Sequence, residues 1–293
     1  ELLEARGLER VAPTERRGLI PFLIPLARDP TTGQTTCILR WPTMKEDMPL
    51  PVVETTDVGV RVVALSVENL IKRLAVEADV QNNPDADDVV ALANSALAPE
   101  RAHPRNSFWD VKKVGKARYM LLNVGPFLDA YTDIASEYIK KGDVVSGLVT
   151  CERAVNVFYG YGAPMLFHAS VLDYLQDRQL EAVDAARAAT RQPLWTMAES
   201  REDREMGIKL AGYSSVEILR DLTAYRANDE QQGEITEGKS PAQVSLDRSA
   251  YLLDAVALGY LDGSWDAARE ELATRYEEGG YPDVAAFIRS GAE

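Results

Sequence analysis

The sequence predicts a mostly α-helical protein in which a stack of helical hairpins follows a small β-containing region. Three observations support this fold class. Apolar residues return at helical spacing four times within residues 128–194, and turn residues interrupt the pattern each time. Residues 18–65 contain short β-prone runs that alternate with prolines. The chain of 293 residues is long enough for one elongated domain or two compact ones.

The first part of the chain is expected to form an arm and then a small α+β region over residues 18–100. Residues 1–17 are charged and mildly helical, which is typical of an extended or helical arm. The apolar segment 19–27 contains two prolines and is expected to lie against a core. Strands are predicted in three β-prone runs, at residues 36–41, 52–55 and 59–65.

Two helices are predicted to complete this region. Ser66 follows the last β-prone run, and its hydroxyl can cap a helix that ends near Asp79. Asp85 opens a second predicted helix, whose early acids Asp87 and Asp88 suit the positive end of a helix dipole. These acids also resemble a cation-binding cluster, but no matching oxygen-rich loop follows them. We therefore favour the helix-start interpretation.

Residues 101–125 are predicted to be a linker that carries the concentrated basic segment of the chain. This segment follows Trp109 and contains Lys112, Lys113, Lys116 and Arg118. An aromatic residue beside a basic run can bind single-stranded nucleic acid, but here the run is short and the formal net charge is −14. A salt-bridged face or a docking site for an acidic partner is the favoured interpretation.

Residues 126–293 are predicted to form a helical-repeat domain. Starting with Tyr131 at a first aromatic position, small and apolar residues follow at repeat spacing at Ile134, Ala135, Tyr138, Gly147, Cys151 and Ala154. A second unit begins at Met165 and closes at Pro193, so the pattern recurs after about 34 residues. These residues resemble the tetratricopeptide repeat family, although Cys151 replaces an aromatic residue and the first closing proline comes late, at Pro164. The resemblance implies stacked hairpins that bind a partner on a concave face.

The rest of this domain is expected to contain a long exposed loop and a weaker third hairpin. Residues 227–241 are almost free of apolar side chains, which is typical of an exposed loop. Apolar spacing returns over residues 250–277 around a Gly-Ser-Trp turn. A short helix at 282–288 is predicted to cover the end of the stack.

Composition restricts the classes of partner. Asp and Glu number 46 against 32 Lys and Arg, so nucleic acid and anionic membrane surfaces are disfavoured and basic protein faces are favoured. The apolar runs are too short for a transmembrane helix. Cys37 and Cys151 are far apart and outside any CxxC pair, so we expect a reducing compartment and no disulfide framework or zinc site.

The sequence gives little support for catalysis. His103 falls in the predicted linker, and His168 occupies an inward repeat position, where a hydrogen-bonded core histidine is the favoured interpretation. Cys151 lies inside a predicted helix and is interpreted as a buried structural thiol. No phosphate-binding loop or hydrolase motif is present. No catalytic residue, cofactor or metal site is therefore predicted.

Two hypotheses for function remain at this point. The preferred one is a non-catalytic scaffold, an accessory or assembly factor that docks on a larger protein complex. Its candidate partner-binding residues are Arg40, Trp41, Trp109, Lys112, Lys113, Lys116, Arg118, Lys140, Lys141 and Arg153. For Arg40 and Trp41 we favour the simpler alternative, in which Trp41 closes the small core and Arg40 is solvated. The second hypothesis is an enzyme that uses clustered carboxylates on a helical scaffold, with or without a metal.

The compartment depends on what preceded Glu1. A transit peptide, a disordered leader and a shortened chain would each leave a start without Met. If a transit peptide was removed, the plastid stroma or the mitochondrial matrix is the expected location. Peripheral association with a membrane complex is compatible with both.

Overall fold

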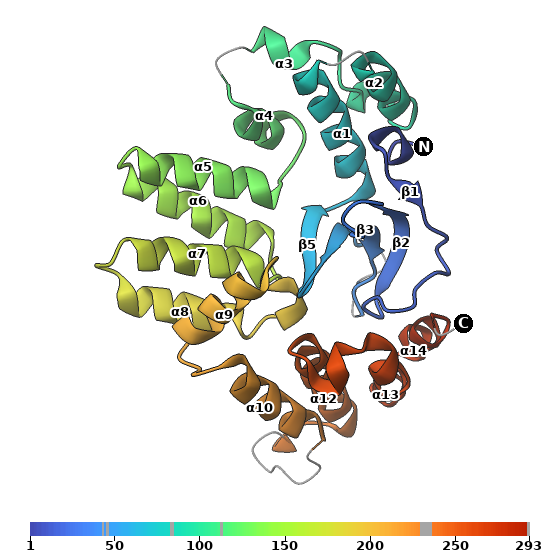
Figure 1. Cartoon of the computed structure of the whole chain (residues 1–293), viewed down its shortest axis with the longest axis vertical. Coiled ribbons are helices and arrows are strands. Elements are labelled where there is room, and N and C mark those ends of the chain that lie inside the picture. The colour runs from blue at the N-terminus through green and yellow to red at the C-terminus, as the bar shows by residue number, and fades with distance from the viewer. Residues whose placement is uncertain (43, 45–46, 83–84, 112–113, 229–235, 292–293) are drawn as a thin grey trace.

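The structure, a computed structural model, describes residues 1–293 except 43, 45–46, 83–84, 112–113, 229–235 and 292–293. Its helices follow an arc around a five-stranded sheet, from α1 at the top of Figure 1 through α5–α9 to α14. The two ends of the chain lie on the same side of the molecule (Figure 1). The predicted fold class is confirmed: the protein is mostly helical, with an antiparallel sheet near its N-terminus.

The sheet is an antiparallel meander in which each strand pairs with the next one along the chain. Its strands are β1 (Glu9–Arg10), β2 (Leu23–Arg28), β3 (Thr35–Leu39), β4 (Val52–Thr56) and β5 (Gly59–Ala64). The three predicted strands are confirmed as β3, β4 and β5. The sequence did not predict β2, because its Pro25 has no backbone N–H to donate to a ladder. The register with β3 shifts between Pro25 and Ala27, and this irregularity accommodates the proline.

The next part of the chain forms short helices at one end of the sheet. They are α1 (Val67–Gln81), α2 (Ala86–Ser95), α3 (Ser107–Asp110) and α4 (Lys116–Asn123), with the 3-10 turn η2 (Pro99–Arg101) between α2 and α3. Another 3-10 turn, η1 (Glu4–Arg6), precedes β1. The predicted cap is present, because the Ser66 hydroxyl accepts a hydrogen bond from Asn69 N. The segment predicted as a linker thus contains two helices, α3 and α4.

Helices α5 to α9 form the left side of the arc in Figure 1. Their bounds are α5 (Leu128–Lys140), α6 (Val144–Val157), α7 (Ala163–Tyr174), α8 (Gln179–Ala189) and α9 (Arg201–Leu210), with η3 (Leu194–Thr196) before α9. Helix α5 packs on α6 and α7 packs on α8, so the two predicted hairpins are confirmed as helical hairpins. A small residue lies at the contact between α5 and α6, where a Cβ on Gly147 would lie 2.6 Å from Ile139 Cδ1 and displace that side chain.

The last helices return the chain to the sheet. They are α10 (Val216–Asn228), α12 (Pro241–Ala257), α13 (Trp265–Glu278) and α14 (Pro282–Arg289), with η4 (Tyr260–Gly263) before α13. Helices α12 and α13 pack together around the predicted turn, and α14 packs on α13. Part of the loop predicted at 227–241, residues 229–235, lies outside the described residues. Ala227 itself is buried in α10, and Pro241 opens α12.

The main core joins the start and the end of the chain. Phe22 and Leu23 of the N-terminal region are buried in one cluster with residues of α12, α13 and α14. Buried arginines reinforce this contact. Arg16 donates to the carbonyl oxygens of Leu23 (3.0 Å) and Phe287 (2.7 Å), and Arg269 donates to the carbonyl oxygen of Arg16 at 3.1 Å. We call this arrangement the terminal clasp.

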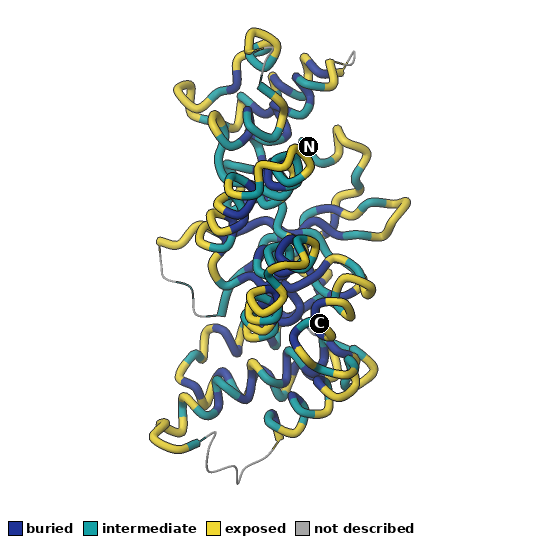
Figure 2. The backbone as a smooth tube through the Cα atoms, turned by 90° about the vertical axis from the view of Figure 1, so that its left-hand side faces the viewer, coloured by how far each residue is buried: buried dark blue, intermediate teal, exposed yellow. Residues whose placement is uncertain are grey.

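Figure 2 shows the molecule from the side on which the hairpin turns lie. The turns are largely exposed, and the buried residues lie between the helices. Tyr174 and Leu180, on either side of the turn between α7 and α8, are 74% and 84% exposed. Among the described residues, no helix combines the length and apolar character needed to cross a lipid bilayer.

Candidate docking groove

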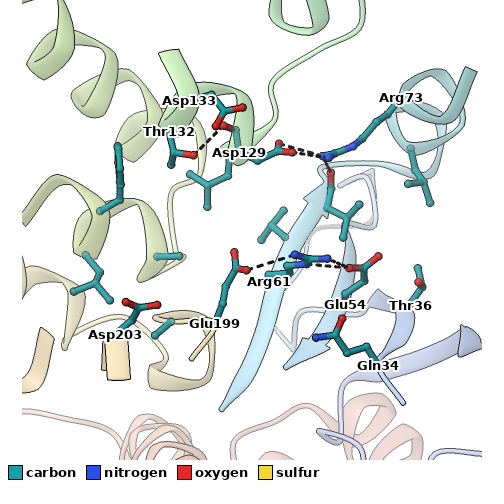
Figure 3. Close-up of a pocket in the computed structure, with 18 of the residues that line it drawn as sticks. Gln34, Thr36, Glu54, Arg61, Arg73, Asp129, Thr132, Asp133, Glu199 and Asp203 are labelled. Carbon is teal, nitrogen blue, oxygen red and sulfur yellow. Dashed lines mark hydrogen bonds and ion pairs between the residues drawn. The ribbon is translucent and has the colours of Figure 1, made fainter. Parts of the chain in front are cut away.

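A groove lies between the sheet and α1 on one side and α5, α7 and α9 on the other (Figure 3). It encloses about 710 Å³. This volume is within the roughly 300–1,000 Å³ of pockets that hold drug-sized ligands. Residues from widely separated parts of the chain line it, so the groove exists only in the folded protein.

One wall is the polar face of the sheet together with α1. Thr36, Glu54 and Arg61 are cross-strand neighbours on β3, β4 and β5, and all three line the groove. Helix α1 adds Arg73 and Glu77, which are one helical turn apart. The cross-strand register and the helical spacing therefore bring polar side chains from four elements to one wall.

The other wall consists of the first helices of the hairpins. Asp129, Thr132, Asp133 and Ser136 recur at spacings of three and four residues on α5 and line the groove, while Ala135 on the opposite face is buried. Helix α7 contributes mainly apolar side chains, and α9 contributes Asp203 and Met206. This wall is the concave face of the helical arc.

The groove is acidic. Its lining contains seven carboxylates, Asp29, Glu54, Glu77, Asp129, Asp133, Glu199 and Asp203, against three arginines, Arg6, Arg61 and Arg73. All three arginines already form ion pairs with acids of the groove. The groove therefore has a surplus of negative charge after its internal pairing.

Arg73 joins the two walls at one end of the groove (Figure 3). It forms an ion pair with Glu77 on its own helix at 3.0 Å, and it donates to Asp129 on α5 and to the carbonyl oxygen of Val63 on β5, each at 3.1 Å. Its guanidinium also lies 5.1 Å from the centroid of the Phe127 ring. Burial of Arg73 opposes its charge, but the two carboxylates outweigh burial and raise its pKa. Arg73 is a fixed structural tie.

Arg61 makes a second and looser tie. It donates to Glu54 on the neighbouring strand at 2.9 Å and lies 3.5 Å from Glu199, which follows η3. Burial disfavours the charged form of Arg61, but the two acids raise its pKa. The side chains of Arg61 and Glu199 are 44% and 56% exposed. Solvent screens such a pair, so its contribution to stability is small.

Arg40 and Trp41 lie inside the fold. The Arg40 guanidinium pairs with Asp283 at 2.7 Å and lies 4.7 Å from the centroid of the Phe287 ring. The Trp41 ring centroid is 5.2 Å from that of Tyr161 and 5.4 Å from that of Trp195. Trp41 thus joins the main core, as in the simpler alternative, while Arg40 is tied to α14 instead of being freely solvated.

The basic segment is also engaged in part by the protein itself. Trp109 Nε1 donates to the carbonyl oxygen of Asp79 at 2.8 Å. Arg118 pairs with Glu137 of α5 at 2.8 Å, which matches the salt-bridged face that the sequence favours. Lys116 is exposed at the start of α4, and Lys112 and Lys113 lie outside the described residues.

The hairpin cations lie away from the groove. Lys140 and Lys141 are at the turn between α5 and α6, where Lys141 pairs with Glu137, and Arg153 is exposed on α6. Among the candidate residues that the structure describes, none lines the groove. The sequence offered one signal for the groove, the polar stripe of Asp129, Asp133 and their neighbours on one face of an amphipathic helix. Its partners come from distant segments and carry no shared motif.

The remaining reactive groups are enclosed. Cys37 and Cys151 are buried free thiols, and burial raises the pKa of each to about 12. His168 is partly buried, and burial lowers its pKa. His103, predicted to lie in a linker, is buried, and its Nε2 is 2.9 Å from Asp79 Oδ2. Within the part of the chain that the structure describes, no three His, Cys, Asp or Glu side chains are grouped to hold a metal ion.

Fold and groove together define the class of this protein as an α+β helical scaffold with an acidic groove. Family models match three successive segments, described as PAB N-terminal (residues 1–119), PAB middle domain (128–214) and PAB C-terminal domain (220–291). A curated relative is the Protein IN CHLOROPLAST ATPASE BIOGENESIS, chloroplastic, of Arabidopsis thaliana. It is 33% identical over 291 residues, which span 98% of this chain and 84% of the relative. The chain belongs to the PAB family. No solved structure matches it.

Proposed function

We propose that this protein is a non-catalytic assembly factor that acts in the biogenesis of a chloroplast ATPase. The observation that carries the proposal is the relative, which is named for chloroplast ATPase biogenesis and whose similarity extends over nearly the whole chain. The plastid is accordingly the proposed compartment, and a protein component of the ATPase is the proposed partner. The acidic groove is the proposed docking site, because it is the concave face of the helical arc.

For four of the seven groove carboxylates, pairing with arginine favours docking over proton transfer. These four, Glu54, Glu77, Asp129 and Glu199, form ion pairs with arginines. General acid–base catalysis needs a carboxyl group that is free to exchange a proton with a substrate. Two of these pairs, Arg73–Asp129 and Arg61–Glu199, instead join the two walls. The α5–α6 and α7–α8 hairpins are, in this proposal, two tetratricopeptide-like units, since α5 and α7 both present their first-helix faces to the groove.

Two measurements test the proposal. Loss of the protein from its source organism should lower the amount of assembled chloroplast ATPase while its individual subunits are still synthesised. The tagged protein, purified from native plastid extract, should retain one or more ATPase subunits in stoichiometric amount. Unchanged ATPase assembly in its absence would refute the role, and so would a protein that is recovered alone.

A further inference from the structure

We propose that the groove binds a basic, partly apolar segment of the partner protein, with Asp133, Asp203 and Glu199 as its cation-binding residues. This inference deepens the proposed function and rests on it. It also agrees with the partner class that the overall charge of the chain favours. The overall charge indicates only that a basic partner is favoured. The groove also indicates which residues bind its positive side chains.

Two acids of the concave wall lack an internal cation in the part of the chain that the structure describes. Asp133 of α5 and Asp203 of α9 line the groove and are exposed, and neither forms an ion pair within the described residues. Asp203 accepts one hydrogen bond from the Ser200 hydroxyl at 2.7 Å, which leaves its other oxygen available. Each side chain can therefore accept a charge-assisted hydrogen bond from a lysine or arginine of the partner.

Glu199 is held by Arg61 only weakly and can exchange it for a cation of the partner. Glu199 and Asp203 are four residues apart at the start of α9, so they offer two carboxylates at one end of the concave wall. The 3.5 Å contact from Arg61 to Glu199 is its weaker pair, because Arg61 also holds Glu54 at 2.9 Å. A partner cation can replace Arg61 at Glu199 while Arg61 keeps its bond to Glu54. Binding then exchanges one exposed pair for another and leaves no buried charge unpaired.

The groove also offers apolar surface to a partner. Between the charged residues the lining contains partly exposed apolar side chains, Val62, Leu128, Phe167 and Met206. Met206 is 41% exposed, so a flexible apolar side chain is available to a partner. A purely charged peptide would leave this apolar surface exposed to water. A segment that carries leucine as well as arginine or lysine would cover it. Acidic partners and nucleic acid would be repelled by the surplus carboxylates.

The test compares two charge-matched double variants of the full chain. The groove variant carries Asp133→Asn and Asp203→Asn. The control carries Asp88→Asn and Asp110→Asn, which remove the same charge from exposed positions outside the groove. The first readout is affinity for the ATPase subunits that the wild-type protein retains from plastid extract. We expect the groove variant to bind about tenfold more weakly and the control to bind like the wild type, since two exposed ion pairs contribute on this order.

A second readout does not depend on those variants or on the identity of the partner. A short peptide of arginine and leucine should bind the wild-type protein, and its affinity should fall as salt is raised. The same peptide with citrulline in place of arginine keeps the shape, loses the charge and should bind at least tenfold more weakly. Equal binding of the two peptides would overturn the inference.

The outcomes separate the two proposals. If ATPase subunits are retained but the groove variant binds them as tightly as the control variant does, the basic-segment inference is wrong and the assembly role stands. If no ATPase subunit is retained while the arginine peptide binds through Asp133 and Asp203, the assembly role is wrong and the groove chemistry stands.

Discussion

Asp79, near the end of α1, holds the segment that the sequence predicted as a linker. Its carboxylate is fully buried and accepts hydrogen bonds from His103 Nε2 at 2.9 Å, Asn106 N at 2.8 Å and Phe108 N at 3.3 Å, and it also pairs with Arg105. Burial alone would raise the pKa of Asp79, but the bonds from His103, Asn106, Arg105 and Phe108 together lower it. One ionised group thus fastens residues 103–108 to the end of α1, beside the bond from Trp109 to the Asp79 carbonyl oxygen.

Asp79→Ala should destabilise the protein by about 3 kcal/mol, because it leaves a buried histidine, an arginine and backbone amides without their acceptor. Because the folded pKa lies below the unfolded value, this stabilisation is present above about pH 4 and is lost as the pH falls through the folded pKa. Urea unfolding and hydrogen exchange over α3 and α4 measure both effects. Asp88→Ala, at an exposed position in α2, is the control. A variant that melts like this control would contradict the assignment.

The pKa of Asp254 shifts in the opposite direction to that of Asp79. Its Oδ1 accepts a hydrogen bond from Leu194 N at 2.7 Å, and desolvation raises its pKa to about 7. The folded state therefore binds the proton more tightly than the unfolded state does. This group's contribution to the free energy of unfolding is largest below about pH 4 and declines as the pH rises towards 7.

Asp254→Asn keeps an oxygen for Leu194 and removes the charge. It should raise the free energy of unfolding at pH 8 by ~2 kcal/mol, about half of what the full pKa shift implies at 1.36 kcal/mol per unit. The expected gain is half of that amount because Asp254 keeps part of its surface in solvent, which screens its charge. At pH 4 the variant and the wild type should be equally stable. A gain of the same size at both pH values would show that the pKa of Asp254 is not the cause.

At the level of single residues, the sequence indicated groups whose role is local. Cys151 as a buried thiol and Ser66 as a helix cap depend on their own helices. The roles of Asp79 and His103 depend on a contact across 24 positions, and no spacing rule predicts such a contact. The groove acids were missed for the same reason.

At the level of elements, β5 and η3 are in unusually close contact. A Cβ on Gly59, the first residue of β5, would lie 1.9 Å from the carbonyl oxygen of Trp195. Gly59→Ala must therefore displace η3 and the buried Trp195 ring, and we expect a loss of about 3 kcal/mol. Thermal denaturation measures it against Gly115→Ala, where no atom lies within 4 Å of the added Cβ and the expected loss is at most ~1 kcal/mol. Equal losses would argue against this contact.

Sequence periodicity predicted the elements well wherever one pattern dominated. The hairpins of α5 to α8 repeat a helical stripe, and β3 to β5 are β-prone runs between turns. The strand β2 was hidden by its proline, and β1 has only two residues, too few for a pattern. Helices α3 and α4 were hidden because their contacts, through Trp109 and Arg118, are tertiary.

At the level of the whole molecule, the sheet depends on the last helices for its core. Phe22, Leu23 and Val60 share one buried cluster with Leu272 and Ile288. Burial of each such side chain contributes about 1.5–3 kcal/mol, and a whole domain is stable by only about 5–15 kcal/mol. A chain ending before α13 should therefore lose its cooperative unfolding transition and bind a dye that detects exposed apolar surface. A sharp transition in that truncated chain would contradict the shared core.

The sequence could not predict this arrangement, because its composition changes suggest consecutive regions whereas the core joins distant ones. Strand and helix patterns report which face of an element is apolar but not which other element covers it. The Arg16 and Arg269 side chains of the terminal clasp are buried charges that act on backbone carbonyls. From composition alone, both would be assigned to the surface.

The terminal clasp also affects how the protein is made. During translation, residues 16–64 leave the ribosome long before residues 265–291, which supply much of the apolar cover of the sheet and the Phe287 carbonyl that accepts from Arg16. The apolar face of the early strands therefore stays uncovered until synthesis is almost complete. The protein thus passes through a stage of synthesis in which its incomplete sheet needs protection from self-association.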